Sequence, residues 1–297
     1  MAQRLTAHDF DQEVLKLFDA YVHGDIDRRG FLSGAQKFAK AGVTAAGLLA
    51  ALSPNFAAGQ QIKPDDSRLR TEKVSIPSPQ GHGTVNAYVV RPASAGTTKL
   101  PMVLVVHENR GLNPHIEDIA RRLALDGFMA VAPDALSTVG GYPGDEDKAR
   151  EAFSKLETPK IQQDFLAAAG WMKGRPEGNG KIGVVGFCFG GGVAHWLATQ
   201  VPDLAAAVPF YGPNPAPTEA TKVKAPLLVH LAANDDRINA PWPQYEAALK
   251  AAGARFEMHQ YPGTQHGFNN DTTPRYDPAA AKQAWDRTVA FFKKNLG

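Results

Sequence analysis

A short apolar run ends in a glycine-flanked cysteine in the second half of the chain. Residues 181–187 (KIGVVGF) are typical of a strand buried on both faces, and residues 193–200 follow as a helix. Between them lies Gly186-Phe187-Cys188-Phe189-Gly190-Gly191-Gly192. A tight strand-to-helix turn needs small residues two positions on either side of its central residue, which it holds in a strained conformation. The pattern therefore predicts an α/β fold that presents Cys188 at the end of a strand.

From Arg70 onward, strand and helix patterns alternate. We expect a mostly parallel central sheet flanked by helices, with the first two strands as an antiparallel edge. The further strands are predicted at 73–77, 84–91, 102–107, 128–132, 205–210, 226–231 and 256–261, and the helices at 116–126, 145–156, 161–173, 243–252 and 278–294. The domain that contains Cys188 is expected to span residues 70–297.

The composition excludes several classes of protein. A single cysteine rules out an intrachain disulfide and any multi-cysteine metal site. The formal net charge is +2, from 32 basic and 30 acidic residues, which gives no general attraction to nucleic acid. No apolar run reaches the length of about 18 residues that a transmembrane helix needs.

The first 62 residues form a separate region. Residues 5–21 predict an amphipathic helix, which Thr6 and Asp9 would begin as a capping box. Arg28-Arg29 precedes a mild apolar stretch at 41–52, which resembles a twin-arginine export signal. The region is therefore either a retained helical arm or a cleaved signal. A retained arm would pack on the body or, as a homodimer contact, on a partner subunit. A retained arm implies a cytoplasmic protein and a working signal implies a periplasmic one.

Two alternative roles for the glycine-rich turn fit the sequence less well. A phosphate-binding loop requires a Lys-Ser/Thr pair, which is absent after Gly192. A dinucleotide-binding turn expects G-x-G-x-x-G in the opening strand–helix unit, whereas Gly186 and Gly190 are four residues apart and lie several strands into the sheet. An inert buried thiol remains an alternative, but the strand, turn and helix all fall where a nucleophile elbow requires them.

A base and its orienting acid are expected after the nucleophile along the chain. His266 follows the last predicted strand in a loop, where a base can reach the elbow, whereas His195 lies in the elbow helix and His230 and His259 lie inside strands. The acid should follow the preceding strand, which leaves Asp235 and Asp236 as candidates on position alone.

Three more residues surround the expected turn. Glu108 follows the strand at 102–107 at the same edge of the sheet, and from its position we expect it to pair with Arg110. The backbone N–H groups of Asn109 and Phe189 are candidates for an oxyanion hole.

These residues together resemble the dienelactone hydrolase family of α/β-hydrolases, in a long form with an N-terminal helical extension. The resemblance rests on blocks at 107–111 (HENRG), 186–191 (GFCFGG), 234–238 (NDDRI) and 261–268 (YPGTQHGF). It implies a triad of Cys188, His266 and Asp235, and a Glu108 that lies near the thiol and keeps the resting cysteine protonated.

The chain departs from the family pattern at one place. Lactone-specific members carry an arginine shortly after the histidine to bind the substrate carboxylate, but here the run is His266-Gly267-Phe268-Asn269-Asn270. Arg275, Arg110 or Arg150 are candidate substitutes. We therefore expect a broader range of small-molecule esters or lactones as substrates.

The expected chemistry is acyl transfer through a thioester on Cys188, without a metal or other cofactor. The alternative from another class is a non-catalytic protein that binds an apolar acid or lactone on the same fold. A redox sensor is disfavoured because no resolving cysteine exists.

Overall fold

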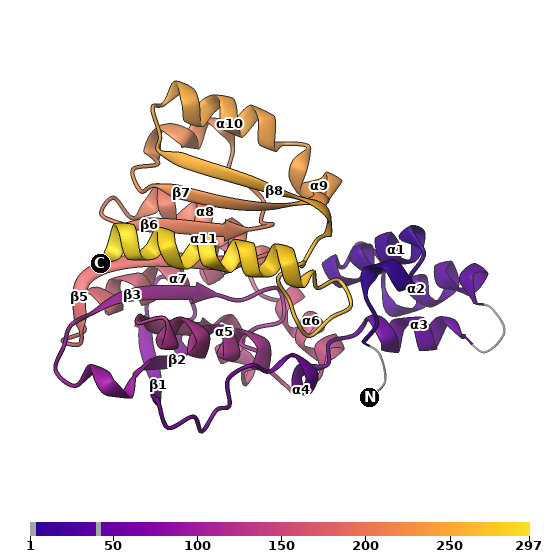
Figure 1. Ribbon diagram of the computed structural model, residues 1–297, viewed down its shortest axis with the longest axis horizontal. Coiled ribbons are helices and arrows are strands. Elements are labelled where there is room, and N and C mark those ends of the chain that lie inside the picture. Colours follow the sequence, from indigo (N-terminus) through magenta and orange to yellow (C-terminus); the bar gives the residue numbers. More distant parts are fainter. Residues whose placement is uncertain (1–3, 40–42) are drawn as a thin grey trace.

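A central sheet of eight strands organises the computed structural model, which describes residues 4–39 and 43–297 (Figure 1). Residues 40–42, which overlap the apolar stretch expected at 41–52, lie outside the described part. The strand order is β1-β2-β4-β3-β5-β6-β7-β8. The strands are β1 (Leu69–Ser78), β2 (Gly83–Pro92), β3 (Leu100–Val106), β4 (Met129–Asp134), β5 (Gly178–Phe187), β6 (Ala206–Phe210), β7 (Leu227–Asn234) and β8 (Phe256–Gln265).

The strand directions confirm the predicted α/β-hydrolase fold. β1 pairs antiparallel with β2, and β2 pairs antiparallel with β4. All pairs from β4 through β8 are parallel. The carboxyl ends of the parallel strands therefore meet at one edge of the sheet, where α/β enzymes place their ligands.

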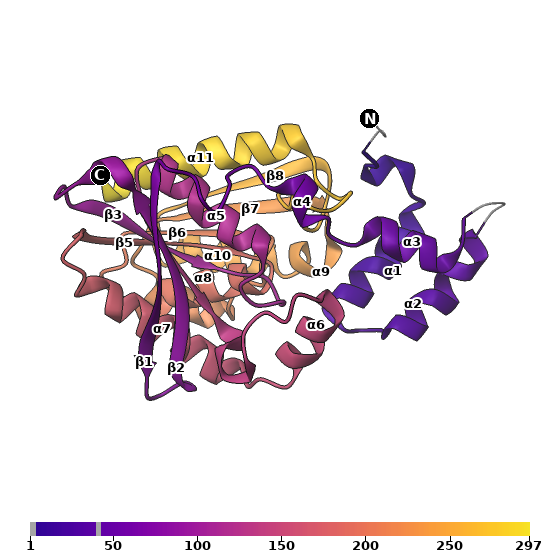
Figure 2. The ribbon, with the colours of Figure 1, turned by 90° about the horizontal axis from the view of Figure 1, so that it is seen from below.

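Helices cover both faces of the sheet because its central strands are apolar on both sides. In β3, Met102 and Leu104 pack on one face, whereas Val103 and Val105 pack on the other. The first face is covered by α7 (Thr158–Lys173), α8 (Phe189–Gln200) and α10 (Trp242–Ala251), and the second by α5 (Pro114–Leu125) and α11 (Pro278–Leu296) (Figure 2). The remaining elements of this part are α6 (Glu146–Ser154), α9 (Asp236–Asn239), η3 (Ala93–Ala95), η4 (Ala135–Val139) and η5 (Pro217–Lys222).

Residues 7–39 and 43–59 fold into short helices with an apolar cluster of their own. Phe18, Phe31 and Leu52 are buried in this cluster. The elements are η1 (Ala7–Asp9), α1 (Gln12–His23), α2 (Arg28–Ala35), η2 (Gln36–Phe38), α3 (Ala45–Leu52) and α4 (Phe56–Gly59). We call residues 7–59 the N-terminal helical segment.

The helix expected at 5–21 is shorter and shifted. The Thr6–Asp9 capping box is present, but it closes the separate turn η1. Asp11 then begins α1 by accepting a hydrogen bond from the Glu13 N–H, and the helix continues past Tyr21 to His23. The capping box and the amphipathic face are therefore confirmed as local features. The prediction of a single continuous helix is wrong, because a cap at Thr6 and a second cap at Asp11 begin two separate elements.

The N-terminal helical segment packs on the body of the same chain beside the strands' carboxyl ends (Figures 1 and 2). The Asn55 N–H donates to the Thr272 carbonyl over 2.7 Å, and Arg122 donates to the Gly59 carbonyl. None of the helices in residues 4–39 and 43–297 is long and apolar enough to cross a bilayer.

The passage from β5 into α8 brings backbones unusually close. A Cβ on Gly186 would lie 1.9 Å from the Gly190 carbonyl oxygen, and one on Gly190 would lie 2.3 Å from the Val106 carbonyl oxygen. Both obstacles are backbone atoms of the sheet and helix, which cannot rotate away. Glycine is therefore required at both positions for the turn to close.

Gly186→Ala is expected to lower the free energy of unfolding by about 3 kcal/mol, the upper end for overpacking a buried site. The control is Gly170→Ala on the exposed face of α7, where a Cβ meets nothing within 4 Å. That change should stabilise the protein by about 0.5–1 kcal/mol, because alanine favours helix over glycine. Urea denaturation measures both, and a Gly186→Ala protein as stable as the wild type would contradict the turn geometry.

Candidate active site

Cys188 lies at the junction of β5 and α8, in a backbone conformation that non-glycine residues rarely adopt. Its φ is 54° and its ψ is −115°, and its side chain is buried. Its N–H donates to the Phe210 carbonyl over 3.0 Å, which fixes the turn against β6. The only other non-glycine residue with a positive φ in the described chain is Tyr211, directly after β6. Such strain is typical of functional sites.

The predicted base and acid meet at the ends of two neighbouring parallel strands. His266 follows β8 and Asp235 follows β7. His266 Nδ1 lies 2.6 Å from Asp235 Oδ2, and both side chains are buried. Asp236 lies instead on the exposed first turn of α9. The geometry therefore separates the two aspartates, which were both candidates on position in the sequence alone, and it places Asp235, the residue that the family resemblance implied, beside His266.

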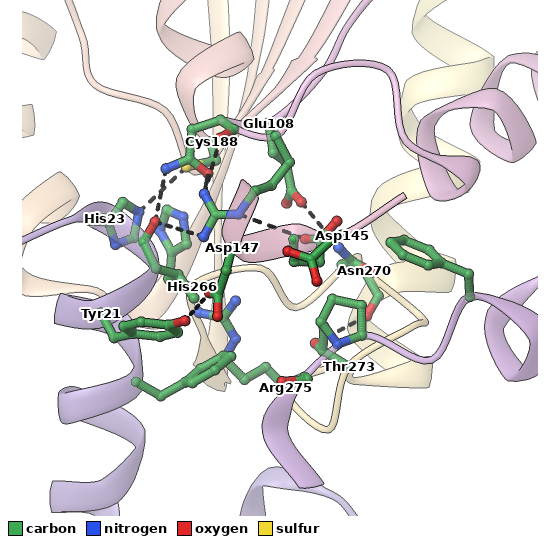
Figure 3. Close-up of a pocket in the computed structure, with 18 of the residues that line it drawn as sticks. Tyr21, His23, Glu108, Asp145, Asp147, Cys188, His266, Asn270, Thr273 and Arg275 are labelled. Atoms are coloured by element: carbon green, nitrogen blue, oxygen red, sulfur yellow. Dashed lines mark hydrogen bonds and ion pairs between the residues drawn. The ribbon is translucent and has the colours of Figure 1, made fainter. Parts of the chain in front are cut away.

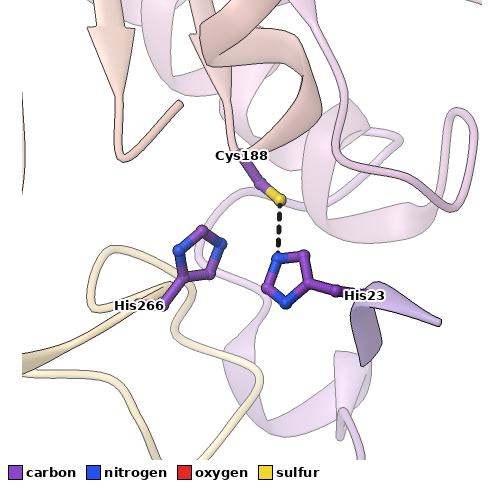
Figure 4. A group of neighbouring side chains, drawn as sticks. All are labelled: His23, Cys188 and His266. Atoms are coloured by element: carbon purple, nitrogen blue, oxygen red, sulfur yellow. Dashed lines mark hydrogen bonds between the residues drawn. The ribbon is translucent and has the colours of Figure 1, made fainter. Parts of the chain in front are cut away.

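A second histidine contacts the thiol from the N-terminal helical segment (Figure 4). His23 is the last residue of α1, and its Nε2 lies 3.4 Å from Cys188 Sγ. The rings of His23 and His266 are 4.7 Å apart and nearly perpendicular. His23 Nδ1 lies 2.8 Å from the Asp19 carbonyl oxygen and 3.3 Å from its carboxylate. The thiol therefore stands between two imidazoles, each with an aspartate behind it.

Sequence reasoning missed His23 because it considered only the histidines that follow Cys188. The approach of His23 depends on how α1 docks, and nothing in the local pattern of residues 5–21 indicates that. Three other histidines follow Cys188, of which His195 was expected in the elbow helix and His230 and His259 inside strands. In the structure His195 packs against the Tyr245 ring, His230 bonds Thr288 and Tyr261, and His259 is partly exposed.

Polar side chains of the body hold the C-terminal end of α1 above the thiol. Asn109 Nδ2 and Arg110 Nη2 donate to the Val22 carbonyl over 2.9 and 3.1 Å, and Arg150 Nη1 donates to the Tyr21 carbonyl over 3.1 Å. These carbonyls belong to the last turn of the helix, where cations are favourable, and the Tyr21 carbonyl also accepts from the Gly24 N–H over 3.2 Å.

The three arginines expected as candidate carboxylate anchors all contact α1. Arg275 pairs with Asp19 at 3.3 Å and lies over the Phe18 ring. Arg110 and Arg150 bind the carbonyls at the end of α1. In this structure these cations therefore hold a protein segment.

The two imidazoles change the acidity of the thiol. Burial alone would raise the pKa of Cys188, but the charges of His266 and His23 outweigh it and lower this pKa to about 6. Burial acts to lower the pKa of His266, whereas the thiolate charge and the bond to Asp235 raise it to about 10. For His23 the thiolate and Asp19 likewise overcome burial and raise the pKa to about 8. The site therefore favours a thiolate paired with an imidazolium near neutral pH.

A cavity of about 380 Å³ opens in front of Cys188 (Figure 3). Glu108, His23 and His266 line it, and α1 supplies part of its wall. Glu108 accepts a hydrogen bond from Asn270 over 3.1 Å, whereas Arg110, its expected partner, pairs with Glu146. Phe189 begins α8, so its N–H has no carbonyl one turn earlier in the helix, and Asn109 follows Glu108 at the same edge.

One group among the described residues has the composition of a metal site. The ligand atoms of His23, Cys188 and His266 all lie within 4.8 Å of one another. Two imidazoles and a thiolate suit a transition metal such as Zn²⁺. The same three atoms are also suited to exchanging protons, which a metal would prevent.

Known proteins resemble this chain over most of its length. The model of the dienelactone hydrolase family matches residues 85–296, and a model described as YqhI-like matches residues 1–40. A "Putative carboxymethylenebutenolidase" of Salmonella typhi is 34% identical over 253 residues, which cover 80% of this chain and 92% of the relative. A "Putative hydrolase fragment YghX" of Escherichia coli is 53% identical over 115 residues, covering 39% of this chain and 97% of the relative.

Solved structures agree with the fold. A "Putative Dienelactone Hydrolase" from Klebsiella pneumoniae superposes with a TM-score of 0.68 and 31% identity, covering 76% of this chain and 99% of its own. A dienelactone hydrolase from Anabaena variabilis, at 21% identity and a TM-score of 0.61, covers 77% of this chain and 100% of its own. At that identity the second likeness concerns the fold alone.

Alkylation should report the acidity of the thiol directly, because Cys188 is the only cysteine. A thiol whose pKa is lowered to about 6 is largely thiolate above that pH, so the rate with iodoacetamide should rise and level off near pH 7. The same protein unfolded in urea should show its inflection near the ordinary thiol pKa of about 8.5. An inflection of the folded protein at that higher pH would contradict the charge arrangement.

Proposed function

This chain belongs to the dienelactone hydrolase family, and on that premise we propose that it cleaves esters or lactones through a covalent thioester on Cys188. The observation that carries the proposal is the buried His266–Asp235 pair at the same sheet edge as a cysteine with a φ of 54°. A nucleophile, a base and an orienting acid are the parts that acyl transfer requires. The family membership itself makes the protein a hydrolase of esters or lactones.

The reaction starts with attack of the Cys188 sulfur on the carbonyl carbon. The backbone N–H groups of Asn109 and Phe189 stabilise the oxyanion, aided by the N-terminal end of α8. His266 protonates the leaving alkoxide and then accepts a proton from the water that cleaves the thioester. Asp235 keeps His266 in the tautomer that directs Nε2 toward the substrate. Glu108, which lines the same cavity, opposes the thiolate by its like charge and so moderates the effect of the two imidazoles on the pKa of Cys188.

The cavity favours small esters or lactones without a required carboxylate. No arginine follows His266 in the run to Asn270, and Arg275 pairs with Asp19. A carboxylate on the substrate would have to displace that pair. The cavity volume of about 380 Å³ and the part of the cavity wall that α1 forms limit the size of the acyl group.

We also propose that the Arg28-Arg29 region is kept in the working protein. Arg28 pairs with Asp147 on α6 over 2.9 Å, and Phe31 is fully buried. Removal of the N-terminal helical segment as a signal would uncover Cys188 and the arginines that bind α1.

Cys188→Ala should abolish hydrolysis of an activated ester such as p-nitrophenyl acetate, because the covalent step is lost. Cys188→Ser should be much slower, since the two imidazoles stabilise a thiolate and an alkoxide forms far less readily. Intact-protein mass spectrometry of rapidly quenched wild type should show an acyl adduct on Cys188. Full activity of the alanine variant would disprove the assignment.

Asp235→Asn and Asp236→Asn form a matched pair of adjacent substitutions. Loss of the carboxylate that orients His266 should lower kcat by about 10²–10⁴-fold, the range for a general base that is lost or misoriented. The change at the exposed Asp236 should leave kcat within about twofold, since surface substitutions rarely disturb a distant site. Equal effects of the two variants on kcat would contradict the role of Asp235.

A further inference from the structure

The Cys188 thiol has two histidines beside it, whereas a nucleophile–base–acid triad needs one. We propose that His23 is a second catalytic histidine, which exchanges its proton with the sulfur. His266 then exchanges protons with the oxygen atoms of substrate and water. The proposal rests on Cys188 being the nucleophile. It makes the N-terminal helical segment a part of the active site.

The hydrogen-bond pattern divides the two histidines between different partners. His23 Nε2 is the nitrogen that contacts Cys188 Sγ, at 3.4 Å. His266 Nε2 is buried and has no hydrogen-bond partner among the described residues. A buried nitrogen without a partner is costly, and a substrate oxygen or a water in the cavity would supply one. Nε2 of His23 is thus in contact with the sulfur, whereas Nε2 of His266 is free to bind substrate.

His23 is held in place by a contact to its ring and by contacts to the backbone just before it. On the α1 side, Asp19 binds Nδ1 and is itself paired with Arg275. On the body side, Asn109 and Arg110 bind the Val22 carbonyl immediately before His23. The side chain of His23 is only 11% exposed. A base fixed by its own carboxylate and by the preceding carbonyl has the preorganisation that catalysis requires.

The tautomer of His23 follows from its neighbours. Arg237 Nη2 lies 2.8 Å from Nε2 and can only donate, so Nε2 carries a lone pair in this state and the ring proton lies on Nδ1. Asp19 accepts that proton through its carbonyl oxygen. The charged or titratable groups that face the ring are therefore Asp19, Arg237, Cys188 and His266. A neutral imidazole is the form that a base needs, and transfer of the thiol proton to Nε2 requires Arg237 to release this nitrogen.

The proton transfers balance over one turnover. The resting thiolate–imidazolium pair of Cys188 and His23 differs from a thiol beside a neutral imidazole only in the position of one proton. The balance is written from the form with that proton on sulfur, with Cys188 as the thiol, His23 neutral and His266 as the imidazolium. The S–H proton moves to His23 Nε2 as the C–S bond forms, and the C–O bond to the leaving group breaks as His266 gives its proton to the alkoxide. Water then loses a proton to His266 as its oxygen bonds the thioester carbon. The C–S bond breaks, and the thiolate regains its proton from His23.

The test compares His23→Gln with His8→Gln in the full-length chain. Gln can keep a hydrogen bond to sulfur but cannot exchange protons, and His8 is an exposed histidine on the same segment. His23→Gln should lower kcat/KM for p-nitrophenyl acetate by about 10²-fold, the low end for losing a general base, because His266 remains. His8→Gln should leave it unchanged.

A second measurement separates a catalytic role from a structural one. Without the positive charge of His23, the thiol loses one stabilising partner, so the iodoacetamide inflection of Cys188 should move to higher pH in His23→Gln. Asp19→Asn removes the carboxylate behind His23, so it weakens the positive charge at His23 without removing the imidazole. This variant should shift the inflection in the same direction by less, and it keeps the test valid if His23→Gln does not fold.

The outcomes distinguish the inference from the function on which it rests. A slower His23→Gln enzyme with an unchanged alkylation inflection would overturn the inference, because His23 would then only support the fold. A wild-type or faster rate would also overturn it, and a faster rate would mean that His23 blocks the thiol. In both cases an inactive Cys188→Ala keeps the proposed function intact, whereas an active Cys188→Ala defeats the function itself.

Discussion

The close approach of backbone at Gly186 and Gly190 is the constraint on which the active site depends. The two glycines let α8 start directly against β5, and the turn between them forces Cys188 to a φ of 54°. A non-glycine residue in such a conformation costs on the order of 1–3 kcal/mol, which the surrounding packing must offset. The fully buried sheet strands on either side supply that packing. In return, the sulfur projects from the sheet edge to the point where the loops after β7 and β8 converge.

Once the sulfur is fixed there, its chemistry is decided by charge. A buried thiol in an apolar site would be a weak acid, because the thiolate would lose its hydration. Two imidazoles with a nitrogen within 4.8 Å of the sulfur reverse this, and the aspartate behind each imidazole stabilises the added positive charge in the interior. In the proposed mechanism a proton therefore passes between members of the cluster without a change in the net charge of the cluster. This arrangement also explains how a single reactive cysteine is shielded, since α1 covers it.

The parts of the site that could be predicted from the sequence are those that the sheet itself positions. Cys188, Asp235 and His266 each follow a strand of the same parallel sheet, so their proximity follows from topology and from the glycine spacing alone. Position along the chain alone did not decide between Asp235 and Asp236, because one residue along a loop decides which side chain turns inward, and only the family resemblance pointed to Asp235. His23 was out of reach for a different reason. It lies 165 residues before Cys188, and its contact depends on how a separately clustered helical segment docks on the body.

The lack of an arginine after His266 and the presence of the N-terminal extension are connected through the arginines near the thiol. Arg110, Arg150 and Arg275 line the region in front of the thiol, and a buried guanidinium without a partner is strongly unfavourable. Here the partners are the Tyr21 and Val22 carbonyls and the Asp19 carboxylate, all in the last two turns of α1. The cations that could have bound a substrate carboxylate thus fix the helix that carries His23. Without α1, Arg110 and Arg150 would still face Glu146 and Asp147, whereas Arg275 would lose Asp19, the carboxylate that pairs with it. The extension therefore changes the charge that the cavity accepts chiefly at Arg275.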